Sequence, residues 1–209
     1  LLIDSSLYTL KDIDGNIYNY AKIGTQVWMT ENLKTTKYND NTDIPNVTDG
    51  SLWVTLSTGG YCYYNNDSSN YANTYGALYN WFAVNTEKLC PAGWHVPSDY
   101  EFYILENFVD SNINNPDAQM WRGIDGGKKL KSFAFNGTNN YGFNFFAGGY
   151  RSPSNAVFEY LGTYGYAWTS NSDGQTNNAW FRFFANNLDS IRRSAYNKNH
   201  GYSVRCIKD

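Results

Sequence analysis

Hydrophobic and polar positions alternate with a period of two in two parts of the chain. Near the beginning, LYTLKDI and IYNYAKI flank the turn residues Asp14, Gly15 and Asn16, a pattern typical of a β-hairpin within residues 1–33. After Tyr141, short alternating segments follow one another, separated by glycines and asparagines. We therefore expect residues 141–209 to be rich in antiparallel strands.

Two segments instead carry apolar residues at helical spacing. The sequence TYGALYNWFAV predicts a helix near residues 74–84, and SDYEFYILENFV predicts another near residues 98–109. Ser98 and Glu101 form the pattern S-x-x-E, in which each side chain accepts a hydrogen bond from the backbone N–H of the other residue. The second helix therefore has a clear predicted start.

The segments between these elements lack periodicity. Residues 34–60 read as a long loop with one short strand at 52–56, residues 65–73 as a polar loop, and residues 110–140 as loop-rich. The order is therefore strands, two helices and long loops, and then strands. This order predicts an α+β fold, and because no repeat or linker interrupts it we expect residues 1–209 to be a single domain.

Composition changes this picture in two ways. Aromatic residues make up 18% of the chain, and 28 asparagines and 18 glycines indicate long loops. Tyr, Asn, Ser and Gly are the residues that binding loops prefer, although they are equally typical of extracellular loops in general. A net charge of −3 gives no reason to expect nucleic acid as a partner, and no apolar run approaches the length of a membrane span.

The sequence carries no strong catalytic motif. Of the two histidines, His95 lies in an apolar segment and is expected to be a hydrogen-bonded structural residue, whereas His200 lies in the turn YNKNHG, where contact with a ligand is one interpretation. We find no nucleophile elbow, zinc-protease motif, P-loop or C-x-x-C, so we expect a protein that is not an enzyme.

Calcium is the one ion that the sequence leaves open. Asp110, Asn112 and Asn114 occupy the first positions of a D-x-N-x-N pattern, but Asn115 and Trp121 stand where an EF-hand requires glycine and glutamate. An asparagine-rich loop that ends a helix explains the pattern better than a looser oxygen site. We therefore expect no metal site and no cofactor, with a looser calcium site that includes Asp117 as the alternative that stays open.

Six blocks distributed over the chain resemble one known family. They are VWMTENL (27–33), YGALYNW (75–81), CPAGWHVPS (90–98), GGKKLKS (126–132), GGYR (148–151) and GYSVRCIKD (201–209). In this order they resemble the Fibrobacter succinogenes major paralogous domain, which is common in secreted and surface proteins of gut and rumen bacteria. The resemblance implies a C-type-lectin-like fold, near the formylglycine-generating-enzyme type, with a mixed sheet, two helices, long loops and termini that lie close together.

The three cysteines also gain an interpretation from the resemblance. Family members often carry a further cysteine close to the position of Tyr71, and this chain lacks it. The resemblance therefore implies a Cys90–Cys206 disulfide and an unpaired Cys62, although pairing of Cys62 with one of the other two remains an alternative.

A lectin-like fold would bring part of the strand-rich region to one loop-bearing face. In AWFRFF, alternation separates two sets of side chains, and we expect Phe181 and Phe183 to point inward and Trp180 and Arg182 to be more exposed. Aromatic surface together with amide and guanidinium groups suits a sugar ring or a peptide, although the same residues could simply fill an aromatic core. The candidate ligand-binding residues are Tyr150, Arg151, Trp168, Ser170, Asn171, Trp180, Arg182, Tyr196, Asn197 and His200.

These observations favour a non-catalytic binding or adhesion module. We expect it to be monomeric, to lie outside the cell or on its outer surface, with a lipid anchor as one form of attachment, and to bind a glycan or a protein. Three alternatives stay open: a variable ligand-binding protein diversified by a retroelement, to which the Asn-rich residues 177–199 would correspond, a glycan-active enzyme, and a structural spacer.

Overall fold

The computed structural model describes residues 8–174 and 177–209, which form a mixed α+β domain built mostly from antiparallel sheets. Its first sheet has the strand order β1-β2-β3-β13-β6. These strands are β1 (Thr9–Lys11), β2 (Ile17–Ile23), β3 (Gln26–Met29), β13 (Ile207–Lys208) and β6 (Trp94–His95). The predicted hairpin is confirmed for the described residues, whereas residues 1–7 of its predicted range lie outside them.

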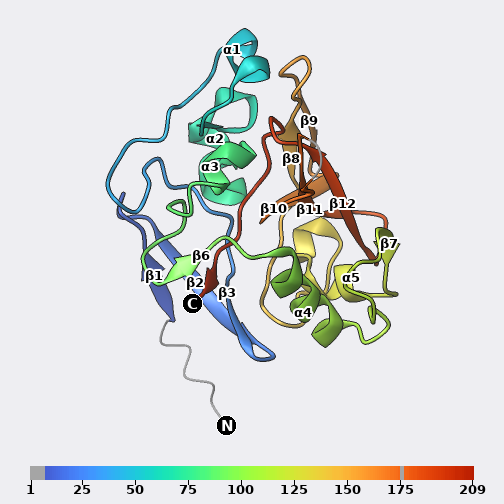
Figure 1. The fold of residues 1–209 in the computed structure, drawn as a ribbon. Helices are drawn as coiled ribbons and strands as arrows, with labels where there is room; N and C mark the ends of the chain where they lie inside the picture. Colours follow the sequence, from blue (N-terminus) through green and yellow to red (C-terminus); the bar gives the residue numbers. More distant parts are fainter. Residues whose placement is uncertain (1–7, 175–176) are drawn as a thin grey trace.

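The last strand lies in the middle of this sheet. Ile207 pairs with Trp28 of β3 on one side and with His95 of β6 on the other, so the end of the chain is held beside the first strands (Figure 1). The Cys90–Cys206 disulfide lies directly before β13, and it links residues 116 positions apart. This pairing is confirmed, and Cys62 is a buried free thiol.

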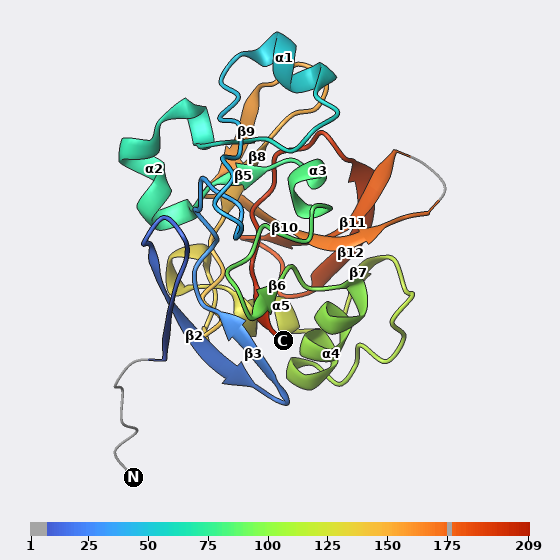
Figure 2. The ribbon, with the colours of Figure 1, turned by 60° about the vertical axis from the view of Figure 1, so that its left-hand side comes forward.

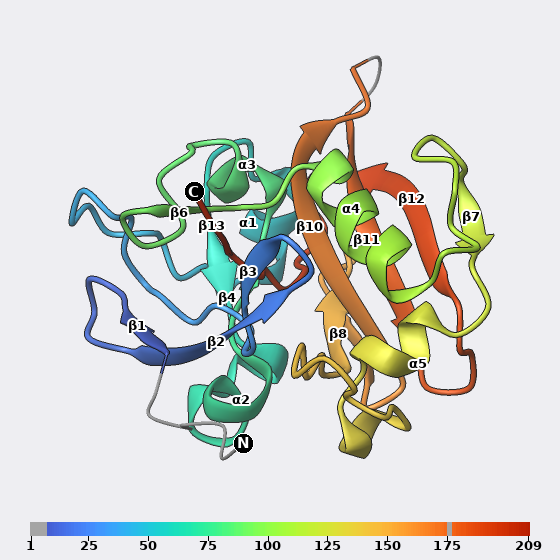
Figure 3. The same cartoon turned by 90° about the horizontal axis from the view of Figure 1, so that it is seen from below.

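The second sheet is formed by most of the strand-rich C-terminal part. Its strand order is β10-β11-β12-β7, and all neighbours are antiparallel. The strands are β10 (Tyr164–Ser172), β11 (Asn178–Ala185), β12 (Ile191–Asn197) and β7 (Met120–Arg122). Helices α4 (Asp99–Val109) and α5 (Gly126–Leu130) cover one face of this sheet (Figure 3).

Helix α4 starts where the sequence predicts. The Ser98 hydroxyl accepts from the Glu101 N–H at 3.2 Å, and the Glu101 carboxylate accepts from the Ser98 N–H at 2.7 Å. Phe102, Leu105 and Val109 form its buried face, where Phe102 meets Trp28 of the first sheet at 5.0 Å between ring centroids. The capping box therefore sets the start of the helix, and its apolar stripe joins the two sheets.

The rest of the chain forms short elements, most of which lie above the first sheet in the view of Figure 2. The remaining helices are α1 (Gly50–Thr55), α2 (Ser68–Tyr75) and α3 (Trp81–Val84), with two 3₁₀ turns, η1 (Tyr64–Asn66) and η2 (Phe133–Phe135). Two further antiparallel pairs join β4 (Tyr61–Cys62) to β5 (Leu78–Tyr79) and β8 (Gly148–Arg151) to β9 (Phe158–Leu161).

The single helix expected near residues 74–84 is wrong. Gly76 has φ 74°, and a Cβ built there would lie 2.7 Å from the Leu33 carbonyl oxygen, so the chain leaves the helical conformation at this residue. Helix α2 ends before Gly76, β5 follows it, and α3 begins only after Asn80. The apolar spacing reflects burial of these short elements from several sides and not one amphipathic helix.

One expected loop and one expected strand are also wrong. Residues 65–73, read as a polar loop, contain most of α2, and residues 52–56, read as a strand, lie largely in α1. Both helices begin at an aspartate that accepts from a backbone N–H three residues later, Asp49 for α1 and Asp67 for α2. Among the described residues, no helix has the length and apolar content that crossing a membrane requires.

Candidate ligand-binding pocket

The face of the second sheet opposite α4 carries a row of large side chains. Tyr166 of β10 is opposite Phe183 of β11, Phe183 is opposite Arg192 of β12, and Arg192 is opposite Trp121 of β7. Because residues paired directly across strands point to the same side of a sheet, these four side chains share one face. The register of three strand pairs therefore places three aromatic rings and one guanidinium group on this face.

Stacked rings extend the row into the core. The Tyr166 ring lies between those of Phe183 and Tyr202, at 4.8 and 4.7 Å between centroids, and its plane is within 7° of both. The His200 ring in turn stacks on the ring of Tyr202, with the two centroids 5.0 Å apart. Such close ring contacts fix the orientation of each side chain and leave little conformational entropy to be lost when a ligand binds.

These rings border a cavity of about 270 Å³, which we call the aromatic pocket. Strands β8 and β9 and the turn after β12 supply its other walls. At its rim, Tyr160 and Tyr196 are 45% and 46% exposed. The lining residues are Tyr150, Tyr160, Tyr164, Tyr166, Phe181, Phe183, Arg192, Tyr196, His200 and Tyr202.

The hydroxyl groups of Tyr150, Tyr166 and Tyr202 and the imidazole of His200 are neutral at physiological pH. Burial raises the pKa of Tyr166 and Tyr202, and burial together with the hydrogen bond to Glu159 raises the pKa of Tyr150. Burial lowers the pKa of His200 to about 4. The pocket therefore offers neutral donors and acceptors over aromatic faces.

The orientation of His200 follows from one hydrogen bond. Its Nδ1 lies 3.0 Å from the Asn197 carbonyl oxygen, and because a carbonyl only accepts, Nδ1 carries the proton. In the neutral ring Nε2 is then an acceptor, and no residue in the described part of the chain donates to it. His200 can therefore accept a hydrogen bond from a ligand hydroxyl.

Of the ten sequence candidates, the structure brings three into this pocket: Tyr150, Tyr196 and His200. A fourth, Asn197, orients His200 through its carbonyl group and accepts from the Asn199 N–H at 2.8 Å through its side chain. The predicted turn YNKNHG therefore lies at the pocket. Its residue Asn197 lies next to the pocket without lining it.

The expectation that Arg182 is exposed is wrong. The strand alternates as predicted, but α4 covers the face that carries Arg182, so its side chain is fully buried. It donates through Nε to Glu106 and through Nη1 to Asp99 at 2.6 Å. Arg193 also donates to Asp99, at 2.6 Å, and stacks on Trp180 at 3.6 Å. Arg182 and the half-buried Trp180 therefore belong to the contact between helix and sheet.

Two more candidates are buried structural residues. The Arg151 guanidinium donates to the carbonyl groups of Val47 and Thr48 and lies over the Trp53 ring at 4.6 Å. The Trp168 indole donates to the Tyr79 carbonyl at 2.9 Å and is buried completely. Both serve to join segments that are far apart in sequence, and neither side chain is available to a ligand.

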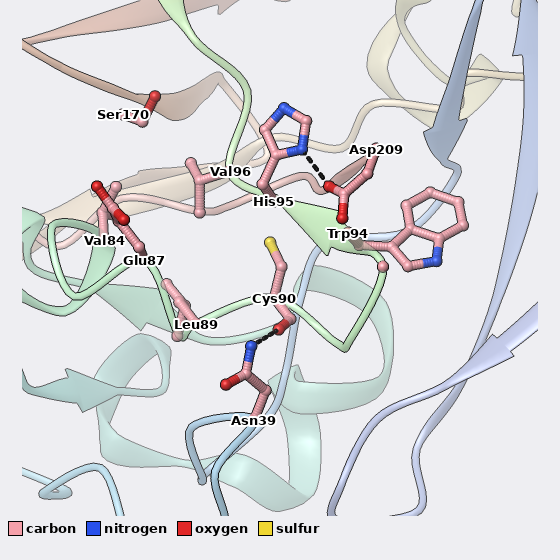
Figure 4. Close-up of a pocket in the computed structure, with 11 residues that line it drawn as sticks. Asn39, Val84, Glu87, Leu89, Cys90, Trp94, His95, Val96, Ser170 and Asp209 are labelled. Carbon is pink, nitrogen blue, oxygen red and sulfur yellow. Dashed lines mark hydrogen bonds and ion pairs between the residues drawn. The ribbon is translucent and has the colours of Figure 1, made fainter.

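The remaining two candidates lie elsewhere. Asn171 is exposed, and its side chain accepts from the Asp99 N–H at 2.8 Å, at the start of α4. Ser170 lines a second cavity of about 420 Å³ beside the disulfide, which we call the disulfide pocket (Figure 4). The expected single binding face is therefore divided between two cavities and a helix start.

The disulfide pocket contains the other histidine. His95 Nδ1 lies 2.6 Å from Asp209 and its Nε2 lies 2.9 Å from Glu101, so both ring nitrogens are engaged (Figure 4 shows the first contact). Burial lowers the pKa of His95, but the hydrogen bonds to Asp209 and Glu101 raise it by more. The net shift of the pKa is therefore upward. This geometry confirms that His95 is hydrogen-bonded, and its structural role stays a prediction.

Asp110 and Asn112, two residues of the D-x-N-x-N pattern, contact each other, and Asp110 also contacts the start of α5. The Asp110 carboxylate accepts from the N–H groups of Ile124, Asp125 and Gly126 and from Asn112, which orders the start of α5. Burial raises the pKa of Asp110, but these hydrogen bonds outweigh it and hold the pKa at about 2. Among the described residues, no group of three or more His, Cys, Asp or Glu side chains could hold a metal ion.

Sequence reasoning missed most of the aromatic pocket. The candidates do not include Tyr160, Tyr164, Tyr166, Arg192 and Tyr202, although all five lie within residues 141–209, which the sequence predicts to be rich in strands. The alternation in YGYAW and SIRRSAY was the available signal, since it places Tyr164, Tyr166 and Arg192 on one face once the strand pairing is known.

Among models of protein families, that of the Fibrobacter succinogenes major domain matches residues 21–208 of the chain. No curated protein and no solved structure matches the chain significantly.

Proposed function

The chain belongs to the Fibrobacter succinogenes major domain family, and we propose that it is a non-catalytic module that binds a carbohydrate in the aromatic pocket. The observation that carries the proposal is the stack of Phe183, Tyr166 and Tyr202 behind an open rim of tyrosines. Sugar rings present C–H groups on their faces and hydroxyls at their edges, and aromatic walls with few polar groups suit both.

The size of the pocket supports a small part of a glycan as the ligand. A cavity of about 270 Å³ lies just below the usual range of small-molecule sites, so it suits a ligand as small as one or two sugar rings. The partly exposed Tyr160 and Tyr196 would contact the next sugars of the glycan, where it extends out of the pocket. A protein ligand would instead require a larger contact surface, so it is the second choice.

The chemistry of the lining residues supports binding over catalysis. Hydrolysis of a glycosidic bond requires two carboxyl groups that face each other across the substrate, and the residues that line the aromatic pocket include no Asp or Glu. The nearby Glu159 carboxylate accepts a hydrogen bond from the Tyr150 hydroxyl. We therefore propose that the domain holds its ligand and does not change it.

We also propose a C-type-lectin-like fold and a location outside the cell or on its surface. The fold proposal is supported by the insertion of β13 between β3 and β6, which holds the two ends of the domain together. The location is supported by the disulfide, because disulfides persist mainly in oxidising compartments.

A glycan array tests the proposed function. The wild-type protein is applied with and without calcium, together with Tyr196→Ala at the rim of the aromatic pocket and Asn39→Ala at the disulfide pocket. We expect glycan signals that do not depend on calcium, that Tyr196→Ala reduces by about tenfold or more, and that Asn39→Ala leaves unchanged. Absence of glycan signals, or the opposite response of the two variants, would refute the proposal.

A further inference from the structure

Among the residues that the structure describes, Arg192 is the only charged side chain that lines the aromatic pocket. It points to the pocket face because it pairs directly with Phe183 on one side and with Trp121 on the other. The rings of Phe183 and Trp121 contact each other, with centroids 5.0 Å apart. Arg192 therefore stands in an aromatic environment at the edge of the cavity.

The guanidinium of Arg192 lacks the partners that its neighbours have. Its Nε is shielded from solvent and donates to no group in the described part of the chain. With the described residues its guanidinium forms one hydrogen bond, from Nη2 to the Met120 sulfur at 3.5 Å, and a thioether is a weak acceptor. Within residues 8–174 and 177–209, no carboxylate forms an ion pair with Arg192.

The contrast with the other arginines of the sheet is direct. Arg182 and Arg193 face α4, and both form ion pairs with Asp99. Arg122 likewise pairs with Glu106. The sheet thus neutralises its arginines on the helix-covered face and leaves one positive charge without a counter-ion beside the cavity. A shielded donor without a partner favours a ligand that supplies an acceptor.

We propose that the ligand is an acidic sugar whose carboxylate accepts from Arg192 while its ring lies on the tyrosines; this inference rests on the proposed function. A carboxylate matches the planar fork of a guanidinium, which binds it through two parallel hydrogen bonds. The hydroxyls of the tyrosines and Nε2 of His200 suit the hydroxyls of the same ring. One cation in the lining matches one negative charge, which favours a uronic acid over a polyanion such as a phosphorylated sugar.

Matched polysaccharides test this assignment. Polygalacturonate, alginate and glucuronoxylan are each compared with their carboxyl-reduced forms, which keep the chain but lose the charge, and with a sulfated galactan. Binding of the wild-type protein is measured by calorimetry against Arg192→Gln, Arg192→Lys and the control Lys11→Gln, which removes an exposed charge from β1. Thermal unfolding of each variant establishes that it is folded.

We expect at least one acidic polysaccharide to bind about tenfold or more tightly than its reduced form. Arg192→Gln should abolish this preference, Arg192→Lys should recover part of it because the charge remains without the fork, and Lys11→Gln should keep it. If Arg192→Gln does not fold, a preference in Arg192→Lys equal to that of the wild type overturns the inference.

The other outcomes separate this inference from the proposed function. Equal binding of acidic and reduced forms, or a preference that survives in Arg192→Gln, overturns the carboxylate assignment and leaves carbohydrate binding in place. Binding of the sulfated galactan alone also overturns it. If none of the polysaccharides, acidic or neutral, binds and the glycan array is empty, the proposed function fails with it.

Discussion

The ring of His200 stacks on the ring of Tyr202, with their centroids 5.0 Å apart and their planes 28° apart. Tyr202 in turn stacks on Tyr166, so the turn after β12 is joined to the sheet through three rings. The position of His200 in the pocket therefore depends on buried aromatic contacts, and its protonation state is coupled to the folding of the site.

This coupling predicts a pH dependence of stability. Burial lowers the pKa of His200 from 6.5 to about 4, so its contribution is complete above pH 6.5 and is lost as the pH falls toward 4. The loss amounts to roughly 3 kcal/mol of unfolding free energy. Denaturant unfolding between pH 7 and 4 measures it, and the difference between wild type and His200→Gln removes the effect of the carboxylates. Parallel pH profiles for the two proteins would contradict the prediction.

Rim and floor residues of the pocket should respond differently to truncation. Tyr202 is 1% exposed, so Tyr202→Ala should cost about 3–5 kcal/mol of stability through the cavity it leaves. Tyr196 is 46% exposed, and Tyr196→Ala should change stability by about 1 kcal/mol or less. Thermal and denaturant unfolding compare the two, and a Tyr196→Ala protein that loses as much stability as Tyr202→Ala would show that the rim is part of the core.

The buried ion pairs under α4 make a separate prediction. Arg182→Ala removes one of the two cations that pair with the fully buried Glu106 and with Asp99, leaving only Arg122 and Arg193 among the described residues, and it also opens a cavity, so it should destabilise the protein by about 3–5 kcal/mol. Lys128→Ala breaks an exposed pair with Asp189 and should cost less than about 1 kcal/mol. Urea unfolding of both variants checks this, and equal costs would mean that the buried network contributes no more than an exposed pair.

The cysteines predict a pattern of chemical labelling. Burial raises the pKa of Cys62 to about 12, so its thiol should resist iodoacetamide in the native protein. Mass spectrometry should find no label in the native state, one after unfolding without reductant and three after unfolding with reductant. Cys62→Ala should give none, none and two under the same conditions. Label on Cys90 or Cys206 without reductant would exclude their disulfide.

Reduction should also destabilise the fold. The Cys90–Cys206 bridge ties the segment before β6 to the last strand and closes a loop of more than a hundred residues. Removing such a bridge costs about 2–5 kcal/mol. Thermal unfolding of Cys90→Ala with Cys206→Ala, compared with Cys62→Ala, isolates the effect of the bridge from that of a lost buried side chain. An unchanged melting temperature in the double variant would contradict it.

The parts of the fold that sequence predicted are those with local signals. The reciprocal hydrogen bonds of Ser98 and Glu101 depend on residues three positions apart, and the hairpin depends on the turn at Gly15. Helix α2 could not be predicted from apolar periodicity because none of its residues is buried. Its neighbour β5 exists because Tyr79 pairs with Tyr61 and Tyr202, which are distant in sequence.

The candidate site was predicted only in part for a related reason. Alternation in β11 correctly separated Arg182 from Phe183, but which face a helix covers is decided by tertiary packing. The aromatic pocket likewise depends on the register that aligns Tyr166, Phe183 and Arg192. A single sequence indicates the alternation of each strand and leaves the alignment between strands undetermined.

The two histidines allow one direct test of where the ligand binds. His200 lines the aromatic pocket and His95 lines the disulfide pocket, so each cavity has its own reporter. The measurement is NMR of the histidine ring protons while the protein is titrated with the oligosaccharide that gives the strongest array signal. We expect the His200 resonance to shift and that of His95 to stay unchanged. A shift of His95 alone would place the ligand in the disulfide pocket and contradict the central claim.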